Sequence, residues 1–112
     1  MPKEEYCIAE FSANHGCVKF SSIAEGRHII VDGEYIKILI RGSYLVYYYA
    51  KAQVPCLVYL KLNGLEIPGS RDYSHSPCGG AMIFPDEMCK TCRLTLCTEN
   101  TLHGIVKFAP VH

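Results

Sequence analysis

Seven cysteines are the residues of this 112-residue chain most able to do chemistry. Three of them follow the spacing Cys89-x2-Cys92-x4-Cys97. Two cysteines at such a spacing on a turn can both reach one ion, so this segment could form half of a zinc site, with Cys78 or His75 as further ligands. The same thiols could instead form disulfides within or between chains, or stay reduced. The sequence leaves these three interpretations open.

The number of cysteines is odd, so at least one thiol must be free, metal-bound or bonded to another chain. Leu94 and Leu96 are the inward-facing residues of a predicted strand over residues 93–98. Alternation then places Cys92 on their face and Cys97 on the opposite one, so the cysteines do not converge cleanly on one ion. A redox role is also disfavoured, because catalytic C-x-x-C motifs usually open a helix whose dipole lowers the thiol pKa. We expect no resident cofactor, with zinc as the alternative.

Two of these cysteines lie in the connection that follows a predicted strand over residues 79–84. Connections of a β-sandwich cluster at its two ends, so we expect Cys89 and Cys92 to be accessible at one end. Cys78 precedes the same strand and should lie at its opposite end, about 20 Å away, too far for a disulfide to Cys89 within one chain. We therefore predict that the exposed thiols of this connection cross-link neighbouring molecules.

No arrangement of residues in the sequence indicates catalysis. The five histidines are scattered at positions 15, 28, 75, 103 and 112, and none stands in a nucleophile motif with serine or cysteine. The sequence also has no glycine-rich phosphate loop and no G-x-S-x-G nucleophile turn. We therefore expect a protein that is not an enzyme.

Composition indicates a single globular domain, residues 1–112. The 49% hydrophobic content, with 20% charged residues, excludes a disordered chain. Eleven basic residues balance eleven acidic ones, so no net positive field attracts polyanions and we expect no nucleic-acid partner. The most apolar stretch, residues 36–62, is interrupted by lysines, Arg41 and Pro55, which excludes a membrane-spanning helix there. The first five residues lack the apolar run of a secretory signal.

The elements that must position these residues are strands. Alternation with period two dominates, and no window of a dozen residues has a helical stripe free of turn residues. The predicted strands cover residues 5–11, 17–20, 28–31, 35–40, 43–52, 57–62, 65–67, 79–84, 93–98 and 104–109. Some nine or ten short antiparallel strands at this spacing predict an all-β sandwich or barrel.

Turn residues separate the predicted strands. Asn63-Gly64 is the strongest two-residue hairpin signal in the chain, and Asp32-Gly33 marks another turn. Residues 68–77 are rich in Ser, Gly and Pro. We therefore expect a polar loop there that faces solvent or a partner.

One predicted strand, residues 43–52, is apolar on both faces. One face carries Leu45, Tyr47 and Tyr49, and the other carries Tyr44, Val46 and Tyr48. A strand of a lone sandwich usually has one polar face, so this strand must be covered twice, by the core and by something else. A second copy of the chain is the economical cover, because tyrosine suits interfaces through its large ring and its hydratable hydroxyl. Burial beneath a loop of the same chain is the alternative.

Four segments, in this order, resemble the tumour necrosis factor and complement globular-head superfamily. They read GSYLVYYY at 42–49, GGAMIF at 79–84, RLTL at 93–96 and GIVKF at 104–108. A further segment, LKLNGLEIPGS at 60–70, is similar to the bacterial branch of this superfamily, the terminal domains of collagen-like spore-surface proteins. In that branch a strand ending in NG is followed by IPGS. The resemblance covers residues 9–111, nearly the whole chain.

The resemblance implies a ten-stranded jelly roll that assembles as a homotrimer. In the superfamily, the strand equivalent to residues 43–52 lies at the trimer axis beside the last strand of the sandwich. The interface so implied consists of Leu45, Tyr47, Tyr49, Leu102, Val106 and Phe108. The bacterial branch implies a place on a spore or cell surface.

Three functions of different classes are compatible with these residues. We expect first a non-enzymatic, trimeric structural or adhesive surface module, whose partners are other surface-layer proteins or a host protein. The first alternative is a receptor-binding ligand of the cytokine kind. The second is a cysteine-dependent zinc-binding domain built from Cys78, Cys89, Cys92 and Cys97.

Overall fold

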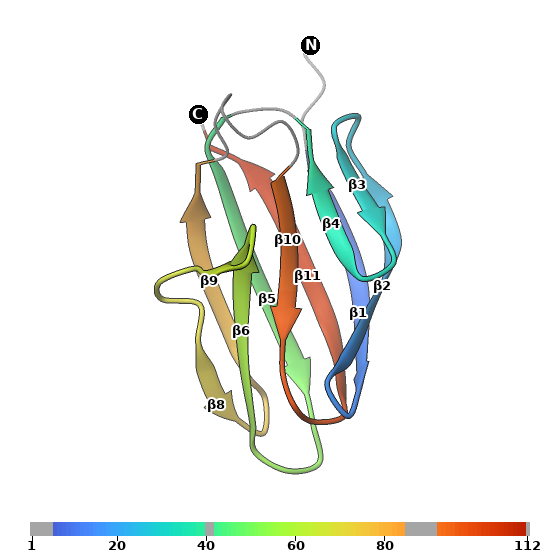
Figure 1. Ribbon diagram of the computed structural model, residues 1–112, viewed down its shortest axis with the longest axis vertical. Helices are drawn as coiled ribbons and strands as arrows, with labels where there is room; N and C mark the ends of the chain where they lie inside the picture. The colour runs from blue at the N-terminus through green and yellow to red at the C-terminus, as the bar shows by residue number, and fades with distance from the viewer. Residues whose placement is uncertain (1–5, 40–41, 85–91, 112) are drawn as a thin grey trace.

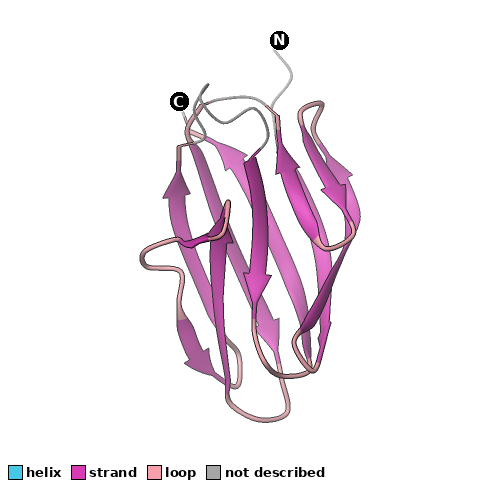
Figure 2. Ribbon diagram, viewed as in Figure 1, coloured by secondary structure: helices cyan, strands magenta, loops and turns pink. Residues whose placement is uncertain are grey.

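The computed structural model describes residues 6–39, 42–84 and 92–111. Within these ranges the chain forms eleven strands joined by loops and turns, as Figure 2 shows. The same ranges contain no helix long and apolar enough to span a lipid bilayer. The fold is therefore carried by sheets alone in the part of the chain that the structure describes.

The strands form two sheets that face each other (Figure 1). The five-stranded sheet has the order β2 (Cys17–Glu25), β1 (Cys7–Asn14), β11 (Leu102–Pro110), β5 (Tyr44–Lys51) and β9 (Cys78–Ile83). The six-stranded sheet has the order β3 (Ile29–Asp32), β4 (Tyr35–Ile38), β10 (Cys92–Cys97), β6 (Cys56–Leu62) and β7 (Leu65–Glu66), with β8 (Asp72–Ser74) paired to β6. Strands distant in sequence thus lie side by side, β1 and β11 among them.

The core lies between the sheets and follows from the alternation of side chains along each strand. On β5, Tyr44, Val46 and Tyr48 are buried, and Phe108 and Val106 of β11 lie directly opposite the last two. From the facing sheet, the central strands contribute Ile36, Ile38, Val58, Leu60, Leu94 and Leu96. One apolar layer therefore joins the two sheets.

The all-β prediction is confirmed, with differences in detail. The described residues hold eleven strands where nine or ten were expected, because β8 lies inside the segment 68–77 expected to be a loop. β2 continues to Glu25, past its predicted end at residue 20. The turn predicted at Asp32-Gly33 is centred one residue later, because Asp32 pairs with Tyr35.

Two-residue turns close the hairpins β1–β2 and β6–β7. At β6–β7, the predicted two-residue turn is present, and Asn63 and Gly64 have φ angles of 53° and 85°, the left-handed values of a type I′ turn. At β1–β2, His15 and Gly16 have φ angles of 53° and 87°. The sequence signals do not predict this second hairpin, because Asn or Asp, and not histidine, usually precedes the glycine.

A buried serine fixes the connection that follows β7. The Ser70 hydroxyl accepts a hydrogen bond from the Leu60 N–H at 3.0 Å and donates one to the Ile67 carbonyl at 2.7 Å. Pro68 and Gly69 form the intervening turn, with Gly69 at a φ of 84°, and the Ser70 N–H closes it on the Ile67 carbonyl. The IPGS segment is therefore a turn that its own serine ties to β6.

The hydroxyl of Tyr48 reaches this connection from the opposite sheet. It hydrogen-bonds to the Ser70 carbonyl at 2.6 Å and lies 3.1 Å from the Val58 carbonyl. Burial raises the pKa of Tyr48, and nearby Asp72 and Cys78 raise it further. The hydroxyl therefore stays protonated and links β5 to the facing sheet.

We expect Ser70→Ala to lower the free energy of unfolding by about 1–3 kcal/mol, because it leaves the buried Leu60 N–H without its acceptor. Urea denaturation followed by circular dichroism measures the change. The matched control is Ser22→Ala, an exposed position on β2, which should change the free energy of unfolding by less than about 0.5 kcal/mol. Equal effects of the two substitutions would show that the buried hydrogen bonds contribute nothing.

Candidate oligomer interface

β5 runs through the five-stranded sheet between β11 and β9, and both of its faces are apolar as predicted. Its inward residues are buried in the core, whereas Leu45, Tyr47 and Tyr49 lie on the outer face of the sheet. Leu45 is 39% exposed and Tyr49 is 46% exposed. No loop among the described residues covers Leu45 or Tyr49. The alternative that a loop of the same chain buries these two side chains is therefore excluded for the described part of the chain.

The strand register identifies the neighbours of the three outward residues. Tyr49 lies between Ile105 of β11 and Cys78 of β9, and Leu45 lies between Ala109 and Met82. Residues directly opposite each other on antiparallel strands share a face, so Ile105 and Met82 belong to the same surface. We call this surface the apolar outer face, and it consists of Leu45, Tyr47, Tyr49, Met82 and Ile105.

Tyr47 is the half-buried centre of the apolar outer face. It lies between Lys107 of β11 and Gly80 of β9, and a Cβ added at Gly80 would lie 3.1 Å from the Tyr47 Cβ. Because Gly80 has no side chain, Tyr47 can pack directly against β9 at this position. The Lys107 Nζ lies 5.9 Å from the centre of the Tyr47 ring, a cation–π geometry. The lysine thus gives this part of the face a positive charge.

Three residues expected at this interface lie elsewhere. Leu102, Val106 and Phe108 are buried in the core of the sandwich, so the prediction that they share a face with Leu45 is wrong. The register gives the reason, because Val106 is opposite Tyr48 and not opposite one of the outward tyrosines. The outward residues of β11 are the alternate set His103, Ile105, Lys107 and Ala109.

The cysteines are dispersed over the described part of the chain. Cys7, Cys56 and Cys92 are buried, Cys97 is half-buried, and Cys17 and Cys78 are exposed. The expectation that Cys92 is accessible is wrong, because Cys92 is the first residue of β10 and only 1% exposed. Cys89 lies outside the described residues.

The positions of the cysteines determine whether they can bind one metal ion together. Within residues 6–39, 42–84 and 92–111, no group of three or more His, Cys, Asp or Glu side chains is arranged to hold an ion. Cys92 and Cys97 lie on opposite faces of β10, as the alternation predicted. At Cys7, burial raises the thiol pKa to about 12, with Glu25 as a second cause, so this thiol is not a thiolate at neutral pH.

Solved structures share this fold. Rabbit GITRL matches with a TM-score of 0.63 at 17% identity, covering 95% of this chain and 94% of that one. Murine APRIL at pH 5.0 matches with a TM-score of 0.59 at 12% identity over 96% of this chain and 100% of that one, and pika GITRL with 0.54 at 16% identity over 93% and 95%. These proteins are tumour necrosis factor family ligands, and the chain therefore has a jelly-roll fold of that kind. No protein-family model and no curated sequence matches the chain.

Proposed function

We propose that the chain is a non-enzymatic module that assembles as a homotrimer through the apolar outer face. The observation that carries the proposal is the outward set Leu45, Tyr49 and Met82, which are 39%, 46% and 41% exposed on adjacent strands. Contiguous apolar surface of this kind on a folded chain marks an interaction site. The trimer, and not another oligomer, is the state implied by the superfamily that the sequence resembles.

We propose a structural or adhesive role on a spore or cell surface, with other surface-layer proteins or a host protein as partners. The support is the similarity of residues 60–70 to the bacterial branch of the superfamily. Cross-linking between trimers through thiols belongs to this proposal. Its candidates are Cys89, together with Cys17 and Cys78, which are exposed. Cys92 is not a candidate for cross-linking, because its side chain is buried.

A receptor-binding ligand is the second candidate function. It is favoured by the solved structures that share the fold, since rabbit GITRL and murine APRIL are ligands of the tumour necrosis factor family. Pull-down of cell-surface receptors by the purified protein separates this function from the structural one. A saturable receptor would favour the ligand, and binding to surface-layer material alone would favour the structural module.

Light scattering coupled to size exclusion tests the oligomer directly. At micromolar concentration with reductant present we expect three times the 12.5 kDa chain mass, because apolar burial and not a disulfide holds the trimer. Without reductant the trimer should persist, together with multiples of its mass where thiols cross-link trimers. A mass of 12.5 kDa would overturn the proposal. A trimer lost only in reductant would overturn the claim that the apolar outer face suffices.

A further inference from the structure

The outer face of the six-stranded sheet carries two matching groups of charged and aromatic side chains. This sheet lies in front in Figure 1, and its outer face is on the opposite side of the sandwich from the apolar outer face. Alternation along β4, β6 and β10 turns the following side chains away from the core: Tyr35, Lys37, Tyr59, Lys61 and Arg93. Assembly through the five-stranded sheet would therefore leave this face free.

The first group, which we call the Tyr35 cluster, consists of Asp32, Tyr35, Lys37 and Arg93. The Arg93 Cζ lies 4.9 Å from the centre of the Tyr35 ring and the Lys37 Nζ lies 6.0 Å from it, both cation–π geometries. Lys37 also forms an ion pair with Asp32 at 3.1 Å. Hydrogen bonds from Lys37 and Tyr35 lower the pKa of Asp32, so this carboxylate is ionised at neutral pH and neutralises one of the two cations.

The second group, the Tyr59 cluster, repeats this arrangement with Tyr59, Lys61, Glu66 and Arg71. The Arg71 Cζ lies 4.5 Å from the centre of the Tyr59 ring, and the Lys61 Nζ lies 5.9 Å from it. The Arg71 Nε donates a hydrogen bond to Glu66 Oε2 at 2.9 Å, and its Nη2 donates another to Oε1. These bonds lower the pKa of Glu66. In this cluster, a guanidinium that lies on a tyrosine ring therefore binds a carboxylate through two parallel hydrogen bonds.

Arg93 lies on its tyrosine ring as Arg71 does, but no carboxylate binds it. Within residues 6–39, 42–84 and 92–111, no acidic side chain forms an ion pair with Arg93, and the nearby Asp32 pairs with Lys37 instead. Lys37 is directly opposite Arg93 in the strand register, and like charges in such positions repel each other. A carboxylate from outside the chain would relieve this repulsion and complete the cluster.

A second cation without an ion pair lies at a fixed distance from Arg93. Lys61 is directly opposite Glu66, but Glu66 forms its ion pair with Arg71. Thr95 is directly opposite Lys61 and two residues from Arg93 along β10, so Lys61 and Arg93 are diagonal neighbours whose backbones are about 7–8 Å apart. Alternate residues of an extended peptide share a face and are about 7 Å apart. Two carboxylates separated by one residue would therefore reach both cations at once.

The charge of the two clusters limits the kind of ligand. Together they hold four cations and two carboxylates, an excess of two positive charges in a chain whose net charge is zero. A long polyanion would meet Asp32 and Glu66 together with the cations, and these carboxylates would repel it. A short segment with two carboxylates needs only the two unpaired cations. The pattern therefore favours an acidic peptide over a polymer of uniform charge.

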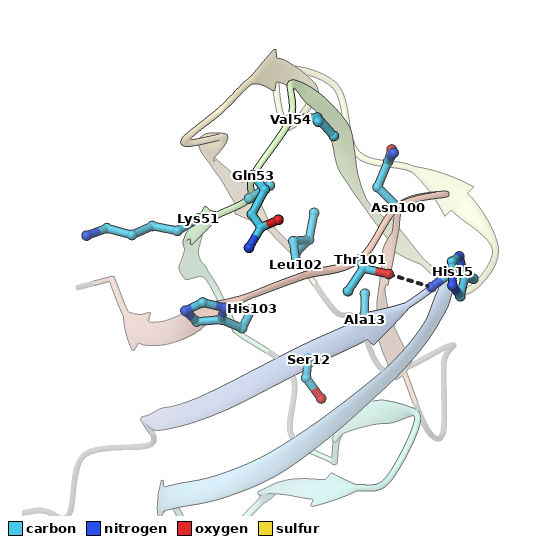
Figure 3. Close-up of a pocket in the computed structure, with 11 residues that line it drawn as sticks. Ser12, Ala13, His15, Lys51, Gln53, Val54, Asn100, Thr101, Leu102 and His103 are labelled. Carbon is cyan, nitrogen blue, oxygen red and sulfur yellow. Dashed lines mark hydrogen bonds between the residues drawn. The ribbon is translucent and has the colours of Figure 1, made fainter.

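The hollow at one end of the sandwich does not offer a comparable combination. It measures about 730 Å³ and lies where the β1–β2 turn meets the β10–β11 connection. Figure 3 shows the Lys51 ammonium directed away from its centre. Leu102 and Ala13, in the middle of the view, are only 4% and 2% exposed, so their side chains belong to the core. The cation and the apolar side chains of this hollow therefore cannot contact one ligand together.

We propose that the outer face of the six-stranded sheet binds an extended acidic segment of a partner protein, in which two carboxylates are separated by one residue. One carboxylate binds the guanidinium of Arg93 in the geometry seen in the Tyr59 cluster, and the other pairs with the ammonium of Lys61. Stacking on Tyr35 and Tyr59 holds the two cations in place before the peptide arrives, which reduces the entropy lost on binding. All of these residues belong to one chain, so the site does not depend on the proposed trimer.

Titration of the isotope-labelled full chain, followed by amide NMR, tests the proposal. A blocked peptide of sequence Gly-Glu-Ser-Glu-Gly should shift the amides of Lys61, Arg93 and Thr95 in a saturable way. The peptide Gly-Gln-Ser-Gln-Gly has no carboxylates, and Gly-Glu-Glu-Ser-Gly places its carboxylates on opposite sides of the extended chain. Each should bind about tenfold more weakly or worse.

A sulfated oligosaccharide of four sugars is the third probe, and it should bind more weakly than the Glu-Ser-Glu peptide. Tighter binding of this oligosaccharide would overturn the proposal in favour of a general polyanion site. Equal binding of the two glutamate peptides would overturn the inferred spacing of the carboxylates, and so would saturation of the glutamine peptide at the same concentration.

Variants locate the site. Arg93→Gln and Lys61→Gln should each weaken binding of the Glu-Ser-Glu peptide about tenfold, because each removes one charge-assisted contact. The matched control is Lys19→Gln, an exposed cation on β2 of the other sheet, which should leave the affinity unchanged. Light scattering reports the mass of each variant, so loss of the peptide site is distinguished from loss of the oligomer. Unchanged affinity in both Arg93→Gln and Lys61→Gln, or no saturable shift in the unsubstituted chain, would overturn the proposal.

Discussion

We expect Leu45→Asp to convert the proposed trimer into a folded monomer of 12.5 kDa, the largest effect of any single surface substitution on assembly. Leu45 is 39% exposed in the isolated chain, so an aspartate there stays hydrated and the sandwich folds. Its direct neighbours across the sheet, Ala109 and Met82, carry no charge that could pair with it. At about 3 kcal/mol per buried carboxylate, three subunits together weaken association about 10⁶-fold.

Size exclusion with light scattering measures the mass, and circular dichroism confirms that the variant keeps its sheets. The matched control is Leu65→Asp on β7, a leucine 74% exposed on the other sheet, which should leave the trimer intact. A trimeric Leu45→Asp variant would exclude the apolar outer face as the interface. If the aspartate variant unfolds, Leu45→Ser serves as the second test of the interface, because it removes apolar surface without adding a charge.

Tyr47 is a less decisive position for this test, although it lies at the centre of the same face. Lys107 lies directly opposite Tyr47 and places its ammonium over the ring. An aspartate at position 47 would therefore gain an ion-pair partner within the sheet. Its effect on the trimer would be reduced by an amount that depends on the salt concentration.

The last strand shows what alternation in the sequence can and cannot predict. Alternation correctly groups Leu102, Val106 and Phe108 on one face of β11. It does not say which face of β11 adjoins which face of β5, because β5 is apolar on both sides. His103 and Lys107 carry the missing signal, since polar residues on one face of a strand mark it as the outer face.

Short and irregular strands cannot be predicted from the alternation of apolar and polar residues. β8 has only three residues, Asp72–Ser74, in a segment whose composition favours a loop, and it exists because it pairs with the start of β6. β2 continues beyond residue 20 through exposed residues that lack alternation, and the register of its pairing with β1 shifts between Ile8 and Ala9. In both places partner strands, and not local sequence, determine the structure.

For the cysteines, an error of one residue in the predicted start of a strand changes the predicted exposure of a thiol. The sequence correctly places Cys92 and Cys97 on opposite faces, because they are five residues apart on one strand. It does not predict that the strand begins at Cys92, and this single residue moves the thiol from an accessible connection into the core.

Gly104→Ala should have the largest effect on stability, lowering the free energy of unfolding by about 3 kcal/mol. A Cβ at this position would lie 2.2 Å from the Tyr49 carbonyl oxygen and 2.7 Å from the Ala50 Cα. These atoms belong to the backbone of β5 or are fixed to it, so no side-chain rotation relieves the clash. β11 and β5 must therefore separate near the start of β11, where Gly104 is opposite Ala50. Urea denaturation measures the loss.

Gly33→Ala is the control that separates this clash from the general cost of replacing a glycine. Gly33 has a φ of 63° and no atom within 4 Å of an added Cβ, so it pays only the backbone strain of about 1 kcal/mol. An equal loss at both positions would mean that β11 tolerates a methyl group against β5. The close approach at Gly104 also sets His103 beside Lys51 and Ile105 beside Tyr49. The same backbone contact therefore positions the edge of the apolar outer face, and a folded Gly104→Ala variant should be weakened in assembly.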